Sequence, residues 1–93
     1  MSVIMMIDNP HGSQEIYERV AAGRTLPIGG SVHLAGPGPH GGWRVIDVFD
    51  SEEEGRRFVR DELAPALRAA GAQGPPPPVE FWPVYRCVTG VPA

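Results

Sequence analysis

The sequence predicts an α+β fold in which two helices cover one face of a four-stranded antiparallel sheet. Apolar runs of strand length alternate with amphipathic helical stretches in the order β-α-β-β-α-β. The 93 residues fit one domain, 1–93, and leave no room for a second. With this order, four strands can pair and both helices can lie on one face without crossed connections, which is the ferredoxin-like arrangement.

The first strand and helix are expected within the first 23 residues. Residues 2–7 (SVIMMI) are apolar on both parities, which is typical of a strand covered on both faces, and the turn residues 8–12 should end it. Ser13 can cap a short helix, and Gly23 is well placed to end it. The apolar side of this helix is formed by Ile16 and Val20, with Tyr17 and Ala21 beside them.

A hairpin is expected in the middle of the chain. Residues 31–36 (SVHLAG) and 42–49 (GWRVIDVF) have the composition of strands. The glycine- and proline-rich stretch 36–41 cannot continue a strand ladder and must turn. These two strands therefore pair as neighbours in the sheet.

The second helix begins after residue 50 and is expected to be interrupted. Ser51 followed by Glu54 matches a capping box, which predicts the start of the helix. Pro65 lies inside the helical pattern and should kink or restart the helix near Asp61. Gly71 is expected to end it.

The C-terminal part is expected to form a spacer, a last strand and a tail. Residues 75–78 are four prolines, which form a stiff extended segment. They lead into a strand over 79–87 (VEFWPVYRC), where Pro83 requires a bulge or an edge position. Residues 88–93 are expected to form a disordered tail.

The predicted strands are apolar on both faces, although two helices can cover only one. In residues 42–49, one parity carries Trp43 and Phe49 and the other carries Ile46 and Val48. A bare apolar sheet face is an interaction surface, and two copies related by a two-fold axis would cover it. We therefore expect a homodimer that forms through the sheet face.

Charge and cysteine content exclude several classes of function. The formal net charge is −3, whereas nucleic-acid binding normally requires a basic patch. The apolar run near the N-terminus is too short for a signal peptide or a membrane span. Cys87 is the single cysteine, so no internal disulfide can form, and a reducing compartment, the cytoplasm, is expected. We read this thiol as buried or at an interface.

The stretch HLAGPGPHGGWRVIDVFDSEEEGRRFVRDELAPAL, residues 33–67, resembles small proteins of the antibiotic-biosynthesis-monooxygenase-like group. This group belongs to the dimeric α+β barrel superfamily, and the first strand and helix also fall in its register. The resemblance implies a dimeric α+β barrel. It also implies a range of activities that includes cofactor-free oxygenases of aromatic polyketides, haem-degrading enzymes, isomerases and cyclases. The haem-degrading branch resembles the chain least, because its histidine ligand lies on a helix and the second predicted helix has no histidine.

His33 and Asp47 are the candidate catalytic residues. Pairing across the turn places residues of equal parity on one face, so the two side chains should share a face with Trp43 and Phe49. An imidazole beside a carboxylate on an apolar wall can act as a general base with its orienting partner. The alternative is a structural hydrogen bond that fixes the hairpin.

The remaining candidates concern substrate binding. Aromatic side chains would line a flat apolar pocket, and arginines would stabilise negative charge on the substrate. The candidate substrate-binding residues are Trp43, Phe49, Arg44, Arg86, Trp82 and Tyr85. The histidines, Asp47 and Cys87 match no metal-ligand spacing, so a metal site is not expected. The resemblance implies that no other cofactor is bound.

The expected function is proton abstraction without a cofactor from a small apolar, aromatic or polyketide-like molecule of secondary metabolism. The deprotonated substrate would then react with dioxygen, cyclise or isomerise. The alternative is a non-catalytic dimeric module that binds a small ligand or a partner protein. Haem binding is a third option, which a Soret band would reveal.

Overall fold

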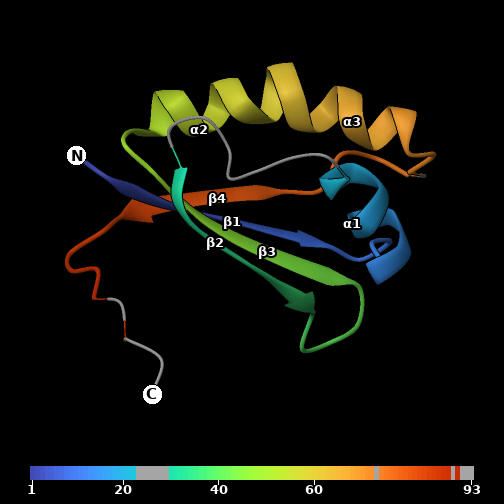
Figure 1. Cartoon of the computed structure of the whole chain (residues 1–93), viewed down its shortest axis with the longest axis horizontal. Helices are drawn as coiled ribbons and strands as arrows, with labels where there is room; N and C mark the ends of the chain where they lie inside the picture. Colours follow the sequence, from blue (N-terminus) through green and yellow to red (C-terminus); the bar gives the residue numbers. More distant parts are fainter. Residues whose placement is uncertain (23–29, 73, 89, 91–93) are drawn as a thin grey trace.

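The computed structural model describes residues 1–22, 30–72, 74–88 and 90. The elements follow in the order β1 (Val3–Asn9), α1 (Gln14–Ala21), β2 (Gly30–Pro37), β3 (Trp43–Phe49), α2 (Glu52–Phe58), η1 (Val59–Leu63), α3 (Ala64–Ala69) and β4 (Val79–Pro83). The strands form one antiparallel sheet in the order β2-β3-β1-β4 (Figure 1). This confirms the predicted α+β, ferredoxin-like arrangement.

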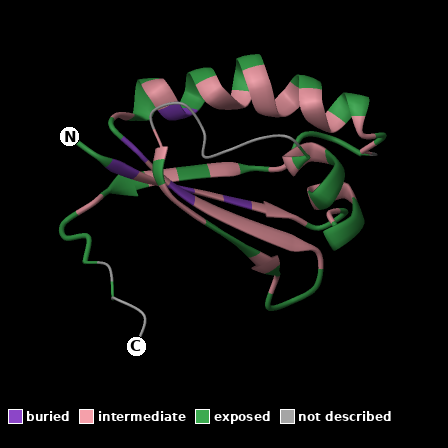
Figure 2. Ribbon diagram, viewed as in Figure 1, coloured by how far each residue is buried: buried purple, intermediate pink, exposed green. Residues whose placement is uncertain are grey.

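The core lies between the sheet and the helical segment formed by α2, η1 and α3. The central strand β1 points Val3, Met5 and Ile7 toward this segment, and all three are buried together with Phe49 of β3. Side chains from the helical segment and β4 pack against this cluster, namely Phe58, Val59, Leu63, Val79 and Phe81. In Figure 2 the buried residues accordingly lie on β1, β3 and the first turns of α2.

The helices begin and end largely as their sequence signals predict. Ser13 and Ser51 accept hydrogen bonds from the backbone N–H groups three residues later, at 3.2 and 3.1 Å. The Glu54 carboxylate does not complete the capping box, because it accepts a hydrogen bond from Arg57. Gly71 adopts a φ of 83° and ends α3 in a Schellman motif. Gly23 lies outside the described residues.

The interruption predicted near Asp61 is a π-helical turn. Pro65 has no N–H to donate to the carbonyl of Asp61, four residues earlier. Residues Val59–Leu63 widen into a π-helix, in which the N–H of Ala64 donates to the carbonyl of Val59. The helix restarts at Ala64 with Pro65 in its first turn, where no intrahelical N–H is needed.

Strand boundaries differ from the expectation in three strands. β2 spans Gly30–Pro37, so Gly36 and Pro37, which were expected to turn, still pair with Arg44 and Trp43 of β3. β1 continues to Asn9 instead of ending at Ile7, because Asp8 and Asn9 still pair with Arg44 and Trp43 of β3. β4 ends at Pro83 rather than at residue 87. Proline cannot continue the ladder, and β4 is an edge strand, the position at which proline is tolerated.

The sheet face opposite the helices carries a set of apolar side chains that the described part of the chain leaves partly exposed. Strand register brings together Ile4, Met6, Val32, Leu34, Ile46, Val48 and Trp82. We call this set the open face. Leu34 is 57% exposed and Trp82 is 40% exposed. Among the described residues, no helix has the length and hydropathy needed to cross a membrane.

Candidate functional site

His33 and Asp47 meet on the sheet face that packs against the helices. The register of β2 and β3 pairs them directly, with Asp47 also beside the buried Met5 of β1. The imidazole Nδ1 lies 2.6 Å from Oδ1 of Asp47, whose side chain is 1% exposed. The two candidate catalytic side chains are therefore hydrogen-bonded, and the carboxylate is closed off from solvent.

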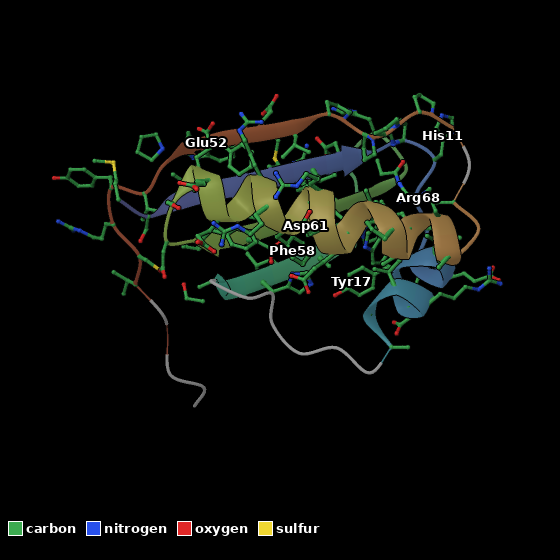
Figure 3. All side chains as sticks on the ribbon, turned by 90° about the horizontal axis from the view of Figure 1, so that it is seen from above. His11, Tyr17, Glu52, Phe58, Asp61 and Arg68 are labelled. Carbon is green, nitrogen blue, oxygen red and sulfur yellow. The ribbon has the colours of Figure 1, made fainter. Side chains whose placement is uncertain are left out.

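Tyr17 of α1 extends this pair into a chain of three groups. Its hydroxyl oxygen lies 2.6 Å from Nε2 of His33. An ionised Asp47 only accepts hydrogen bonds, so we assign the proton of a neutral imidazole to Nδ1. Nε2 then carries the lone pair and accepts from the Tyr17 hydroxyl. Figure 3 shows the Tyr17 side chain extending from α1.

Burial keeps both ends of this chain from ionising easily. Burial raises the pKa of Asp47 above its usual value, while the hydrogen bond from His33 opposes the rise. Burial also raises the pKa of Tyr17, and the negative charge of Asp47 adds to the effect. Tyr17 is therefore a protonated phenol at neutral pH, able to donate to His33.

The raised pKa of Asp47 predicts how stability depends on pH. Between the unfolded value of 3.8 and the higher folded value, the folded protein binds this proton more tightly than the unfolded chain does. The free energy of unfolding that Asp47 contributes must fall as pH rises through this window. We expect the unfolding free energy of wild type minus that of Asp47→Asn to fall as pH rises from 3.8. Above the pKa of Asp47 in the folded protein, this difference should become constant.

Urea denaturation at a series of pH values from 3.8 upward measures this difference. The same exchange at exposed Asp50 is the matched control, and it should leave the pH dependence of wild type unchanged. A difference for Asp47→Asn that is flat or rises with pH would contradict the assignment.

Trp43 is linked to the same chain through aromatic contacts. The Tyr17 ring stacks on His33 with ring centroids 5.9 Å apart, and it lies tilted against Trp43 at 5.4 Å. The indole Nε1 of Trp43 is buried and has no hydrogen-bond partner in the part of the chain that the structure describes. This donor is the unsatisfied polar group of the region.

Phe49 shares the face of His33 but occupies a different position from the one expected. Its side chain is fully buried, and its ring packs on Phe58 of α2 with centroids 5.6 Å apart. In this structure it fills the core and does not line an open wall.

The other four candidates do not meet His33 within one chain. Arg44 lies on the open face side of β3 and donates two hydrogen bonds to Asp8, at 2.6 and 2.7 Å. Trp82 belongs to the open face. Tyr85 and Arg86 lie beyond the end of β4, both exposed, with the guanidinium 5.8 Å from the ring centroid.

Cys87 is exposed in this chain, so the expected burial within the chain is wrong, while its expected place at an interface stays a prediction. The physical reason is that β4 ends at Pro83, so the residues after it leave the sheet. Within the described ranges, no three His, Cys, Asp or Glu side chains gather as a metal site requires.

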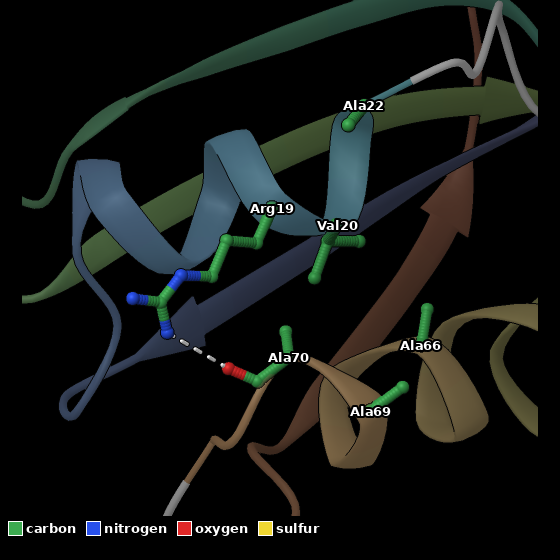
Figure 4. A pocket seen from close by; sticks show the side chains of 6 residues that line it. All are labelled: Arg19, Val20, Ala22, Ala66, Ala69 and Ala70. Atoms are coloured by element: carbon green, nitrogen blue, oxygen red, sulfur yellow. Dashed lines mark hydrogen bonds between the residues drawn. The ribbon is translucent and has the colours of Figure 1, made fainter.

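A cavity of about 540 Å³ opens between α1 and α3 (Figure 4). Its volume lies in the range of small-molecule pockets. The lining residues are Arg19, Val20, Ala22, Ala66, Ala69 and Ala70. Arg19 closes one side by donating to the carbonyl of Ala70 at 3.2 Å. None of these residues is a candidate predicted from the sequence.

Tyr17 is the site residue that the sequence did not single out. The sequence pattern places Tyr17 only beside the apolar stripe of its helix, one position from Ile16. The signal that could have found it is helical position, because the side of α1 that carries Ile16 and Val20 must face the sheet that holds His33.

Comparisons with known proteins support the fold. No protein-family model and no curated protein matches the chain. Its structure is similar to that of SnoaB, a cofactor-independent oxygenase from Streptomyces nogalater, solved as a mutant. The TM-score is 0.54, the match covers 94% of each chain, and 16% of the residues are identical. At this identity the likeness shows the fold alone.

Proposed function

We propose that the protein is a cofactor-independent enzyme of secondary metabolism, acting in the cytoplasm, that removes a proton from a small aromatic or polyketide-like molecule. The observation that carries this proposal is the hydrogen-bonded chain from Tyr17 through His33 to the buried Asp47. The likeness to an oxygenase that works without a cofactor supports it as an analogy of fold.

In this proposal His33 is the base and Asp47 orients it. The carboxylate fixes the tautomer that leaves the Nε2 lone pair free to take a proton, and it offsets the charge that then forms on the ring. Because Nε2 faces the Tyr17 hydroxyl, a proton can also arrive through that oxygen. Tyr17 would then give its own proton to Nε2 while it accepts the proton of the substrate.

Dioxygen can complete the reaction when the substrate is an activated methylene compound. Loss of one proton leaves a carbanion, which transfers electrons to dioxygen and forms a carbon–oxygen bond. The resulting peroxide loses water as the second C–H bond breaks and a carbonyl forms, so that R₂CH₂ and O₂ give R₂CO and H₂O. The substrate supplies the electrons. A cyclisation or isomerisation would begin with the same proton transfer.

Dithranol, a dihydroxyanthrone with an acidic methylene group, tests the proposal directly. Its conversion to the anthraquinone changes the visible spectrum and consumes dioxygen, so both can be followed with and without the protein. A protein-dependent rate of quinone formation and of oxygen uptake, in a one-to-one ratio, is the expected result. A rate equal to that of buffer would count against the oxygenase.

A non-catalytic binding module is the second candidate, favoured by the cavity between α1 and α3. None of its lining residues belongs to the Tyr17–His33–Asp47 chain. In such a module the His33–Asp47 bond would be purely structural. A His33→Ala variant that loses stability while every ligand still binds would favour this reading.

We also propose that the protein is a homodimer formed through the open face. The support is the set of apolar side chains there, including the half-exposed Leu34 and Trp82, which lie opposite the helices. A second copy placed by a two-fold axis covers the same set on both chains.

Changing Leu34 to aspartate is expected to convert the dimer into monomers. By symmetry the substitution places two carboxylates in an apolar interface, which costs several kcal/mol and raises the dissociation constant by roughly a hundredfold or more. Native mass spectrometry over a range of protein concentrations measures this. Val88→Asp is the matched control at an 82% exposed apolar residue outside the sheet. A monomeric wild type, or a dimeric Leu34→Asp variant, would refute the proposed interface.

A further inference from the structure

The indole N–H of Trp43 is a buried hydrogen-bond donor without an acceptor among the described residues. The indole nitrogen can only donate, so no rearrangement of protons satisfies it. Leaving such a group buried and unpaired destabilises the folded protein. Buried polar groups in native proteins are normally paired, so an exception calls for a physical reason.

The surroundings of Trp43 hold this donor in place. Gly12, in the loop before α1, lies so close that a Cβ atom there would come within 2.8 Å of the Cβ of Trp43. The Tyr17 ring also contacts the indole, in a tilted arrangement. Nearby polar groups on the same sheet face, His33 and Asp47, are paired with each other. Of these three side chains, Trp43 is the one whose hydrogen-bond donor is unpaired.

We propose that the Trp43 N–H donates a hydrogen bond to an oxygen of the substrate, so that the site selects phenols or enolisable ketones over hydrocarbons of the same shape. This inference rests on the proposed function for the reaction, although binding alone can test it. A fixed donor at the place where negative charge develops on oxygen stabilises an enolate or phenolate more than its neutral parent.

The position of Tyr17 connects this donor to the base. Its ring contacts both the imidazole and the indole, so the distance between their centroids is at most the sum of the two separations, 5.9 and 5.4 Å. The nitrogen has almost no exposed surface, so a ligand that reaches it must displace a neighbouring side chain.

The first test uses the two indole N–H signals in proton–nitrogen correlation spectra. The probes are β-naphthol and β-methylnaphthalene, which differ by a hydroxyl in place of a methyl group. We expect β-naphthol to move the Trp43 N–H signal downfield, while β-methylnaphthalene does not. Trp82, on the open face, is the internal control and should not respond to either probe. The inference would be overturned if β-naphthol does not shift the Trp43 N–H signal, or if both probes shift it equally.

The second test compares wild type with Trp43→Phe, which keeps an aromatic ring and removes the N–H. Calorimetry should show β-naphthol binding weakened by roughly threefold to tenfold, the value of one hydrogen bond, with β-methylnaphthalene unchanged. Thermal denaturation establishes that the variant is folded. Equal binding of β-naphthol by both proteins, or no binding by wild type, refutes the inference. Failure of the proposed function looks different, because the phenol then binds through Trp43 while dithranol is not turned over.

Discussion

Replacing His33 with alanine is expected to lower the protein-dependent rate of dithranol oxidation by about a hundredfold to ten-thousandfold. The variant removes the group that accepts the proton in the proposed mechanism, and it leaves Tyr17 without its acceptor at 2.6 Å. Binding of the aromatic probe should change much less, because the rings of Tyr17 and Trp43 remain. The effect should therefore appear in kcat rather than in KM.

Two further variants separate loss of the base from loss of structure. Removing the imidazole leaves the buried Asp47 unpaired, which can unfold the protein for reasons unrelated to catalysis. His33→Asn keeps an N–H near the position of Nδ1, so it can still donate to Asp47 but cannot accept a proton. It should fold and still lose the same activity.

His40→Ala is the matched control, because His40 is exposed in the turn between β2 and β3. It removes an imidazole from the same hairpin and should leave the rate within twofold of wild type. A fully active His33→Asn variant would remove His33 from the mechanism, even if the wild type oxidises dithranol.

The His33–Asp47 pair was within reach of sequence reasoning because it depends on local rules. A short turn rich in glycine and proline joins the two strands, and residues of equal parity across such a hairpin share a face. The bulge in this ladder lies between Gly30 and Val32, before His33, so the register at the pair is unaffected. The fold class follows from patterns of the same local kind.

The contributions of Tyr17 and the arginines depended on long-range geometry. Tyr17 reaches His33 only because α1 docks on the sheet at a particular rotation, which no spacing along the chain fixes. Arg44 could have faced either side, and its ion pair with Asp8 depends on the register between β1 and β3. Residues 84–87 could continue the strand beyond a bulge at Pro83, or the strand could end at Pro83. The sequence allowed both arrangements.

The sequence predicts where the second helix is interrupted, and the structure shows the interruption there as a π-helical turn. The sequence does not predict which form the interruption takes. Pro65 required a break in hydrogen bonding near Asp61, which a kink, a new start or a wider turn could each provide. The wider turn keeps Val59 and Leu63 both packed against the core. The π-helical form is therefore compatible with the packing of the core.

Phe49→Ala is expected to destabilise the protein by about 3–5 kcal/mol, the usual range for a buried phenylalanine in a core that cannot collapse around the gap. The ring is fully buried, lies in the cluster with Val3, Met5 and Ile7, and packs on Phe58. In a chain of 93 residues this loss is a large share of the total stability. A large fraction of the variant is then expected to be unfolded at physiological temperature.

Urea denaturation at one fixed protein concentration measures the loss, since the stability of the proposed dimer would depend on concentration. Tyr85→Ala is the matched control, because this aromatic side chain is 94% exposed and should change stability by less than about 0.5 kcal/mol. The comparison also separates two roles of Phe49. A pocket wall would lose probe binding with little loss of stability, whereas a core residue loses stability first. Near-wild-type stability in Phe49→Ala would mean that the sheet and α2 do not pack as described.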